Sequence, residues 1–318
     1  MKSRGDWLLP TEVLHLKSKR DGSVYRLIGT GRESSGVIAK RAHCEKGAIE
    51  RAVYEEVLAI MSVNAIGYFG SVDEDDEPYL WLFLEDAGDR RYSPASPEDR
   101  VLGAHWLGSL LGASEAARRL PDRGPAFYHR HLKSLLTKLP TIQGRSSIST
   151  DGIEILRSIE TLCRHVDKHW DALADFCEPI PRTLVHGDCL PKNVHVRETA
   201  DSREIAFFDW GGAGLGLAAT DLGLLALPKQ GPPGFDPGYE AYLEAVGDRW
   251  DSADIALIEQ LAQIGQLFWV LKVVDKSLPD LYKPLPHVLD NFRLYAATLM
   301  RSMDMPAWAP TPALQFRH

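Results

Sequence analysis

Cysteine is scarce in this sequence. Its four cysteines, Cys44, Cys163, Cys177 and Cys189, form no CxxC pair and no ligand spacing with histidine within 318 residues. Disulfide scaffolds need paired cysteines, and zinc modules need closely spaced cysteine and histidine ligands, so neither class is expected. The four residues are expected to be reduced thiols of a cytoplasmic protein.

Long apolar runs are also missing. The chain contains no run of about 18 apolar residues, the length that a membrane-spanning helix needs. The first stretch, MKSRGDWLLPTEV, lacks the apolar centre of a signal peptide. We therefore expect no membrane partner and a cytoplasmic location.

An excess of positive charge is absent as well. The chain has 36 Lys and Arg against 44 Asp and Glu, a net charge of -8. Proteins that bind nucleic acids normally carry basic residues that neutralise phosphates, so no nucleic-acid partner is expected. A negative balance of this size favours cationic ligands only weakly. With 44% hydrophobic residues and this length, the chain is typical of a globular protein with two lobes.

The first 88 residues predict a small sheet with one inserted helix. Alternating apolar and polar residues in EVLHLKS, from Glu12, and VYRLIG, from Val24, predict two strands, and VIAKR predicts a third. The segment AIERAVYEEVLAI has apolar residues near the helical period. GYFGSV and YLWLFLE predict two further strands, separated by an acidic turn.

Helical periods dominate from residue 89 to residue 318. Examples are HRHLKSLLTKL, the long run DGIEILRSIETLCRHVDKHWDALADF, and IALIEQLAQIGQLFWVLKVV. Short strands are predicted at TLV, VHVR and IAFFDW. The predicted fold class is therefore α+β, with an antiparallel sheet and one helix in residues 1–88 and a mainly helical lobe in residues 89–318.

Polar residues follow short apolar strands in the stretch LVHGDCLPKNVHV and shortly after it. Asn193 stands five residues after Asp188, and Asp209 ends the next apolar strand. One carboxylate suits a reacting hydroxyl, and an amide with a second carboxylate suits Mg²⁺, which prefers oxygen ligands. Phosphoryl transfer requires positioning, charge neutralisation and a residue that orients the attacking hydroxyl. These residue types together indicate such a reaction.

HGDCLPKN resembles the catalytic loop of the aminoglycoside phosphotransferase and choline kinase family, the small-molecule branch of the protein-kinase-like fold. FDWGG stands in the place of the second kinase motif. The resemblance covers most of the chain. It implies that Asp188 orients the acceptor hydroxyl and accepts its proton, and that Asn193 and Asp209 hold Mg²⁺ on the phosphates of ATP. His186 is expected to brace the loop through backbone near the DWG turn.

VIAK resembles the third-strand motif of this fold, so Lys40 is expected to contact the α- and β-phosphates. Glu50, Glu55 and Glu56 all qualify as its partner on the following helix, and the pattern E-x-x-x-Y-x-x-V favours Glu50. The resemblance assigns the phosphate-covering loop to KRDGS, which ends at Ser23, because that loop joins the first two strands. The glycine-containing TGRESSG is then a hairpin turn.

WLFLEDAGD resembles the hinge between the two lobes, which places residues 1–88 in a nucleotide-binding lobe and residues 89–318 in a lobe with the catalytic loop and acceptor site. A strand that ends in a polar turn presents free backbone groups. The adenine is expected at the backbone of Glu85 and Ala87, with Phe83 beside the base.

The segment after Asp209 points away from protein kinases. Only eleven residues separate it from Asp221, which leaves no room for a regulatory activation segment, and Gly187 replaces the arginine of the kinase loop. Asp221, in TDLGLLAL, is expected to cap a helix and to brace the catalytic loop through backbone N–H groups. The architecture therefore implies a kinase of small molecules.

The acceptor is left open by the sequence. The leading hypothesis is an ATP-dependent O-phosphotransferase that modifies an aminoglycoside or related antibiotic. A metabolic kinase of a choline-like amino alcohol, sugar or amino acid is the second, and a catalytically silent nucleotide-binding scaffold is the third. Acidic or aromatic residues of the C-terminal part could bind ammonium groups, although solvated or core positions explain them equally well. They are Asp236, Glu259, Asp275, Asp280 and Asp290, and Trp269, Tyr282, Tyr295 and Trp308.

Overall fold

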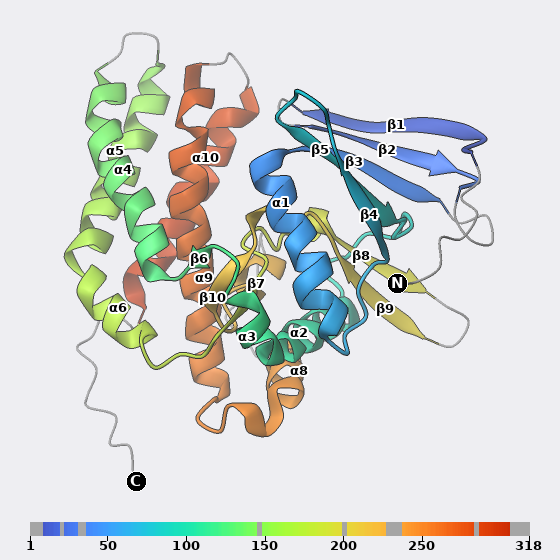
Figure 1. Cartoon of the computed structure of the whole chain (residues 1–318). Helices are drawn as coiled ribbons and strands as arrows, with labels where there is room; N and C mark the ends of the chain where they lie inside the picture. The colour runs from blue at the N-terminus through green and yellow to red at the C-terminus, as the bar shows by residue number, and fades with distance from the viewer. Residues whose placement is uncertain are drawn as a thin grey trace.

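The chain folds into a five-stranded sheet with one helix and a larger, mainly helical part beside it (Figure 1). This computed structural model describes residues 9–19, 22–30, 36–144, 148–198, 202–226, 237–282 and 286–305. The predicted α+β class, with the strands first and the helices after them, is confirmed.

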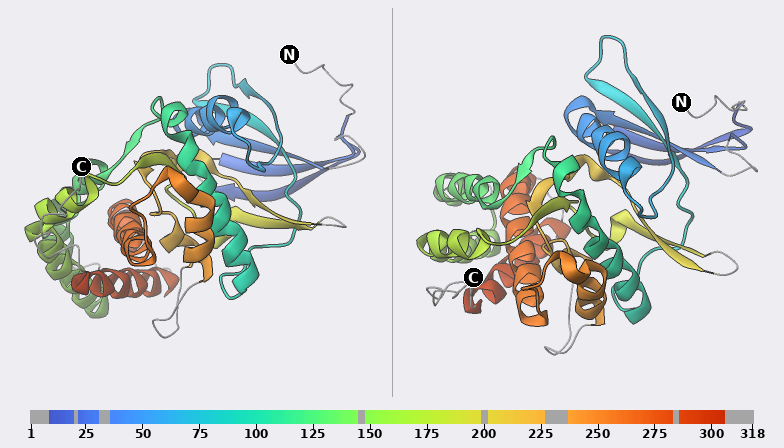
Figure 2. Two further views of the ribbon diagram at one scale, coloured as in Figure 1. Left: turned by 90° about the horizontal axis from the view of Figure 1, so that it is seen from below. Right: turned by 60° about the horizontal axis from the view of Figure 1, so that its bottom comes forward.

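The N-terminal sheet is antiparallel and has the order β1-β2-β3-β5-β4. Its strands are β1 (Glu12–Lys19), β2 (Gly22–Ile28), β3 (Val37–His43), β4 (Tyr68–Asp73) and β5 (Tyr79–Glu85). Helix α1 (Cys44–Ala52) follows β3 directly and lies against one face of the sheet (Figure 2). A glycine at the contact allows the close approach, because a β-carbon at Gly47 would lie 2.7 Å from the side chain of Leu80.

The two faces of this sheet carry different residues. Lys40 pairs with Leu82 across β3 and β5, whereas its neighbour Ala39 pairs with Phe83. Because side chains alternate along a strand and paired residues share a face, Lys40 and Leu82 face α1 and Phe83 faces the other side. This alternation decides which predicted nucleotide ligands can reach the cleft.

The C-terminal part combines nine helices with short strands in the described residues. The helices are α2 (Pro97–Ser109), α3 (Ser114–Ala117), α4 (Pro125–Gln143), α5 (Thr150–Lys168), α6 (Trp170–Cys177), α7 (Leu222–Leu225), α8 (Pro237–Val246), α9 (Ile255–Ser277) and α10 (Pro286–Arg301). The strands are β6 (Asp122–Arg123), β7 (Arg182–Val185), β8 (Val194–Glu198), β9 (Arg203–Phe207) and β10 (Gly214–Leu217). They form a small sheet, β6-β10-β7, and a hairpin, β8-β9.

One long helical run of the sequence is broken in the structure. The amphipathic stretch from residue 151 to residue 176 divides at His169 into α5 and α6. The amide of His169 donates to the carbonyl of Val166, three residues back, which tightens the last turn of α5. The break lets Trp170 bury its ring against His129 of α4, with the ring centroids 4.6 Å apart.

Helix α9 is the central helix of the C-terminal part and is strongly apolar. The segment from Ile255 to Leu281 contains an 18-residue window with a mean hydropathy of 1.2, apolar enough by length and composition alone to cross a membrane. More than half of that window, 56%, is buried inside the protein, where α9 packs against α4, α7, α8 and α10. This degree of burial is typical of a helix in the core of a globular protein.

Helix α9 approaches the chain before α7 so closely that one position has no room for a side chain. A β-carbon at Gly265 would overlap the carbonyl oxygen of Thr220, which precedes Asp221. This contact ties the core helix to the segment that supports the catalytic loop.

The variant Gly265→Ala is therefore expected to lose ~1–3 kcal/mol of unfolding free energy, because the added methyl group overpacks a backbone contact. The control is Gly144→Ala, where φ is -76° and a β-carbon would meet nothing closer than 3.7 Å. Urea unfolding of both variants tests this. Equal midpoints for Gly265→Ala and the parent protein would show that α9 can shift without cost.

Candidate active site

Three charged side chains from separate segments meet between the sheet and the helical part. Lys40 Nζ in β3 lies 2.7 Å from Glu50 Oε2 in α1 and 2.5 Å from Asp209 Oδ1 in the turn after β9. Glu50 is completely buried. The two other candidate partners are engaged elsewhere, since Glu55 accepts from Tyr68 and Glu56 pairs with Arg119.

Electrostatics hold Lys40 and Asp209 in their charged forms, whereas burial raises the pKa of Glu50. Burial on its own would lower the pKa of Lys40, but the carboxylates of Glu50 and Asp209 outweigh this and raise it. Burial would likewise raise the pKa of Asp209, but the ammonium of Lys40 lowers it well below its usual range. Asp209 also has a φ of 69°, in the left-handed region that few residues other than glycine adopt. The turn thereby holds a carboxylate anion beside Lys40.

Asp188 follows β7 and has partners on both carboxylate oxygens. Trp269 Nε1 in α9 donates to Oδ1 at 3.0 Å, and Lys192 Nζ lies 3.0 Å from Oδ2. Asn193 Nδ2 donates to Oδ2 at 3.1 Å and to the Asp188 carbonyl at 2.8 Å. Burial acts to raise the pKa of Asp188, but the charges of Lys192 and Lys272 and these hydrogen bonds lower it. The side chain of Asp188 is therefore held as an ionised carboxylate.

The loop that carries Asp188 is supported from below by a buried carboxylate. Asp221 Oδ2 accepts from the His186 amide at 2.5 Å and Oδ1 accepts from the Gly187 amide at 3.2 Å. The His186 ring is 2.9 Å from the carbonyl of Phe208, next to the DWG turn, as predicted. Asp221 stands at the N-cap position of α7, but its side chain makes no capping bond to that helix. The expected cap is thus replaced by support of the loop.

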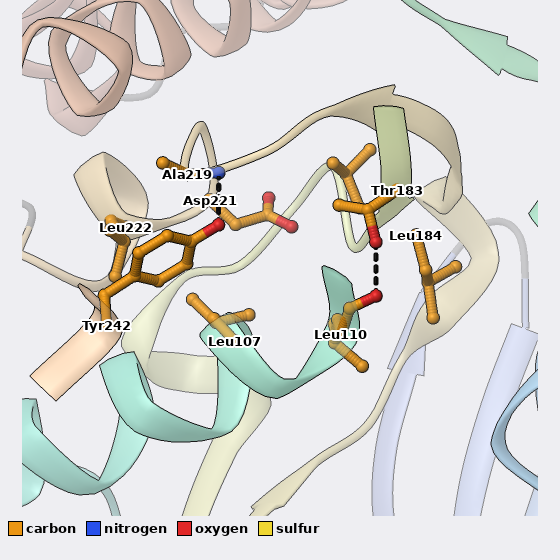
Figure 3. A pocket seen from close by; sticks show the side chains of 9 residues that line it. Leu107, Leu110, Thr183, Leu184, Ala219, Asp221, Leu222 and Tyr242 are labelled. Atoms are coloured by element: carbon orange, nitrogen blue, oxygen red, sulfur yellow. Dashed lines mark hydrogen bonds between the residues drawn. The ribbon is translucent and has the colours of Figure 1, made fainter. Parts of the chain in front are cut away.

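A small cavity lies beside Asp221 (Figure 3). Tyr242 Oη accepts a hydrogen bond from the Ala219 amide at 2.9 Å, and Thr183 Oγ1 donates to the Leu110 carbonyl. The cavity belongs to the packing beneath the catalytic loop, because none of its lining residues is a predicted ligand of nucleotide, metal or acceptor. The lining residues are Leu107, Leu110, Thr183, Leu184, Val185, Ala219, Asp221, Leu222 and Tyr242.

The segment after β5 offers one backbone donor to a ligand. The amide of Glu85 donates to Gly67 at 2.7 Å, and that of Asp86 donates to Gly36 at 3.3 Å. Ala87 follows, and its amide has no acceptor in the part of the chain that the structure describes. The carboxylate of Glu85 is occupied by Arg197 of β8 at 2.9 Å. Only the backbone of this segment is therefore available to a base.

Two predicted nucleotide ligands point away from the cleft. Phe83 lies on the sheet face opposite Lys40, because it pairs with Ala39. Ser23 pairs with Arg41 and so has its side chain on that same opposite face. The alternation of side chains along a strand therefore directs both side chains away from the face that carries Lys40. Arg20 and Asp21 of the predicted phosphate loop, and residues 31–35 of TGRESSG, lie outside the described residues.

An apolar pair stands where Phe83 was expected. Ile38 pairs with Leu84 across β3 and β5, two residues from the Lys40–Leu82 pair and on the same face. Unlike Phe83, these two side chains lie on the sheet face that carries Lys40.

The oxygen atoms near Asp188 suit a hard cation. Asn193 turns its amide nitrogen to Asp188, which directs its carbonyl oxygen elsewhere, and Asp209 uses only Oδ1 with Lys40. The described residues contain no group of three or more His, Cys, Asp or Glu side chains that could hold a metal by themselves. One amide and one carboxylate oxygen fit Mg²⁺, which takes its remaining ligands from phosphates and water.

Comparison with known proteins agrees with this geometry. The sequence profile described as the phosphotransferase enzyme family matches residues 13–255, more than half of the chain. The chain belongs to this family. The phosphotransferase is thus an enzyme of the small-molecule kinase class, with the two-part fold of that class. No curated protein sequence matches it significantly.

Solved structures similar to the phosphotransferase include three from different branches. A spectinomycin phosphotransferase in complex with ADP and spectinomycin has a TM-score of 0.62 at 11% identity, covering 93% of each chain. A putative aminoglycoside phosphotransferase from Ralstonia eutropha has 0.59 at 16%, covering 95% of this chain and 93% of the other. An ethanolamine kinase from Plasmodium vivax has 0.57 at 14%, covering 93% and 83%. These likenesses concern the fold.

Several residues of the site were not singled out from the sequence of the phosphotransferase. Lys192 immediately precedes Asn193 within HGDCLPKN, so its place in the loop was a visible signal. Lys272 interrupts the apolar sequence of α9 between buried Leu271 and Val274. A lysine in such a run indicates a functional or paired charge. Trp269, considered as an ammonium ligand, instead donates to Asp188.

The variant Asp221→Asn is expected to lose ~1–3 kcal/mol of unfolding free energy, because an amide can accept only through one oxygen and places an NH₂ group against a second backbone N–H. Asp254→Asn is the matched control, since Asp254 caps α9 by accepting from the Leu257 amide and asparagine caps equally well. Chemical denaturation of both variants measures the difference. Equal losses for the two would contradict a special role of Asp221 in supporting the loop.

Proposed function

We propose that the phosphotransferase moves the γ-phosphoryl group of Mg-ATP to a hydroxyl group of a small molecule. The observation that carries this proposal is the convergence of Lys40, Asp188, Asn193 and Asp209 from β3, the loop after β7 and the turn after β9. The Phe208 amide, next to Asp209, donates to the Asn193 carbonyl at 3.1 Å, so the two predicted metal ligands are held on adjacent backbone.

Asp188 has the role of proton acceptor in this proposal. As the acceptor oxygen bonds to the γ-phosphorus, the bond from that phosphorus to the bridging oxygen of ADP breaks, and the hydroxyl proton passes to a carboxylate oxygen of Asp188. Trp269 and Asn193 fix the orientation of that carboxylate. A group whose pKa is lowered remains ionised when the hydroxyl approaches, which suits this task.

Lys40 binds the α- and β-phosphates in the proposal, with Glu50 holding its ammonium in place. Asn193 and Asp209 hold Mg²⁺ against the phosphates, and the cation supplies neutralisation of negative charge during transfer. When nucleotide binds, Lys40 keeps its buried contact with Glu50 and donates hydrogen bonds from its other N–H groups to phosphate oxygens.

The base of the nucleotide is proposed to lie between Ile38 and Leu84 and the hinge, with the Ala87 amide as donor and the Glu85 carbonyl as acceptor. Similar structures contain ADP in two cases and GDP in two others. A single backbone donor does not select adenine over guanine, so GTP belongs in any test of the nucleotide. The division into a nucleotide-binding part, residues 1–88, and a catalytic part, residues 89–318, is part of this proposal.

The acceptor is proposed at this stage only as an alcohol. Related folds include complexes with spectinomycin and hygromycin B, which keeps sugar-containing antibiotics among the candidates, and an ethanolamine kinase, which keeps amino alcohols. The acidic residues that could hold ammonium groups form no cluster in the described structure. Asp275 is bound by Lys138 and His131, and Asp290 is paired with Arg293. Asp236 lies outside the described residues.

A cytoplasmic location is proposed because Mg-ATP is available there. It is supported by the thiols, since Cys44 is free and exposed, and Cys163, Cys177 and Cys189 are free and buried. A small-molecule partner is sufficient for the reaction, and neither nucleic acid nor a membrane is invoked.

Asp188→Ala is expected to lower the transfer rate ~10²–10⁴-fold, the usual contribution of a positioned proton acceptor, while Mg-ATP binding persists. Phosphate transfer is followed by ADP release and nucleotide binding by calorimetry. Asp175→Ala, at an exposed position of α6, controls for loss of an acid. Loss of Mg-ATP binding in Asp188→Ala would assign this residue to the nucleotide instead.

Asp209→Asn is expected to weaken nucleotide binding mainly when Mg²⁺ is present, because a carboxylate ligand becomes an amide while the side-chain shape is kept. Calorimetric titrations of ATP with Mg²⁺ and with EDTA separate the two contributions. If the variant gains as much affinity from Mg²⁺ as the parent protein does, Asp209 is not a metal ligand.

A further inference from the structure

One face of α9 presents charged and aromatic groups to the catalytic loop. Trp269, Lys272 and Lys276 stand at positions i, i+3 and i+7, which share a side of a helix. Trp269 Nε1 donates to Asp188 Oδ1 at 3.0 Å, and the ammonium of Lys272 donates to the carbonyl of Gly187. The loop follows β7, which belongs to the small sheet β6-β10-β7.

A third cation meets the loop from β6. Arg123 Nε donates to the carbonyl of Gly212 at 3.0 Å, and its guanidinium carbon lies 4.4 Å from the centre of the Phe127 ring. Gly212 is adjacent to the catalytic carboxylate, since a β-carbon there would lie 3.9 Å from that of Asp188. Arg123 therefore lies on the same side of the catalytic residue as α9.

The three cations lie within one another's electrostatic fields. Burial lowers the pKa of Lys272 to about 8. The carboxylate of Asp188 opposes this shift, and the positive charges of Lys276 and Arg123 add to it. The pKa of Lys276 is lowered too, first by burial and then by Lys46 and Arg123. Like charges at this range oppose one another unless an anion is present.

We call Arg123, Lys272 and Lys276 the acceptor-side cations. The carboxylate of Asp188 acts on both lysines through space, but no carboxylate of the described residues contacts them directly. In the described part of the chain none of them forms an ion pair. Asp275, beside Lys276 in sequence, is held by Ser134 at 2.7 Å and by Lys138 at 2.7 Å. Asp188 is the acid of the catalytic loop beside these cations, and its carboxylate already forms an ion pair with Lys192.

We propose that the acceptor is an alcohol that also carries an anionic group, a carboxylate or a phosphate, and that the acceptor-side cations bind this group. The inference rests on the proposed function, because it places the hydroxyl at Asp188. Lys276 lies roughly 6 Å along the helix beyond Lys272, from the rise of 1.5 Å per residue. An anion held there leaves the hydroxyl of a small hydroxy acid or sugar phosphate within reach of Asp188.

The charge of this region disfavours a polycationic acceptor. An ammonium group near Asp188 would face Arg123, Lys272 and Lys276, and like-charge contacts at an interface are selected against. An anionic acceptor also meets negative charge on the nucleotide, so additional cations near the reacting oxygen are required for the two to approach. The acceptor-side cations meet that requirement.

The test compares acceptors that differ in charge, using ADP release from Mg-ATP. Glycerol 3-phosphate and glycerate are the anionic probes, glycerol is the neutral one, and ethanolamine and kanamycin are the cationic ones. We expect kcat/KM to be at least about tenfold higher for an anionic probe than for glycerol, the effect of one favourable charge contact. Higher turnover of ethanolamine or kanamycin would overturn the inference and leave the proposed function standing.

Charge reversal at the exposed end of the group gives a matched pair of variants. Lys276→Glu should lower kcat/KM for the anionic probes at least about tenfold. The difference in kcat/KM between the anionic and the cationic probes should therefore become smaller. Lys168→Glu, an exposed lysine of α5, makes the same change of net charge outside the site and should leave the ranking of acceptors unaltered. Equal effects of the two variants would overturn the inference.

A binding measurement separates failure of the inference from failure of the proposed function. Glycerol 3-phosphate is titrated calorimetrically into the protein saturated with Mg-ADP. If no acceptor is turned over, binding that weakens in Lys276→Glu and persists in Lys168→Glu still supports an anion site, and the proposed transfer fails. If glycerol 3-phosphate does not bind, or binds both variants equally, the anion site is overturned.

Discussion

The ion-pair triad of Lys40, Glu50 and Asp209 is the interaction on which the rest of the structure depends. It joins the sheet, α1 and the turn after β9, so a single ammonium connects the two parts of the molecule. The buried carboxylate of Glu50 would be costly without that ammonium, because an unpaired charge away from water is strongly disfavoured. The relative position of the two parts is therefore coupled to the charge arrangement that a nucleotide would meet.

The catalytic loop depends on a second set of contacts that comes entirely from the helical part. Asp221 holds the backbone of the loop from below, and Trp269 of α9 orients the side chain of Asp188. Close packing of Gly265 against Thr220 connects these two supports. The apolar character of α9 thus has a structural purpose, because a helix buried in the core can hold a catalytic carboxylate in one orientation.

Local charge near the catalytic loop is opposite in sign to the charge of the whole chain. The net charge is -8, yet Arg123, Lys272 and Lys276 gather at the loop without forming ion pairs in the described structure. Fields near a reacting group depend on the nearest charges, whereas distant surface charges are screened by salt. Composition alone therefore does not give the sign of charge on the acceptor that we propose for this site.

The sequence by itself determined the architecture and indicated the residues that we propose to react. Strand alternation, helical periods and the motif HGDCLPKN with its downstream Asp209 were sufficient, because they are local patterns with fixed spacing. The sequence favoured Glu50 as the partner of Lys40 among three candidate glutamates, and the structure confirms this pairing. The sequence did not show the break at His169 between α5 and α6, because this break depends on the packing of Trp170 against His129.

Only the tertiary structure decided which side chains face the cleft and which charges surround the acceptor. Phe83 and Ser23 were misplaced because one residue of strand register exchanges the two faces of the sheet. Arg123 and Lys272 are about 150 residues apart in sequence, as their numbers show. No spacing rule links residues so distant, and their meeting at Asp188 results from the packing of β6 and α9 around the catalytic loop.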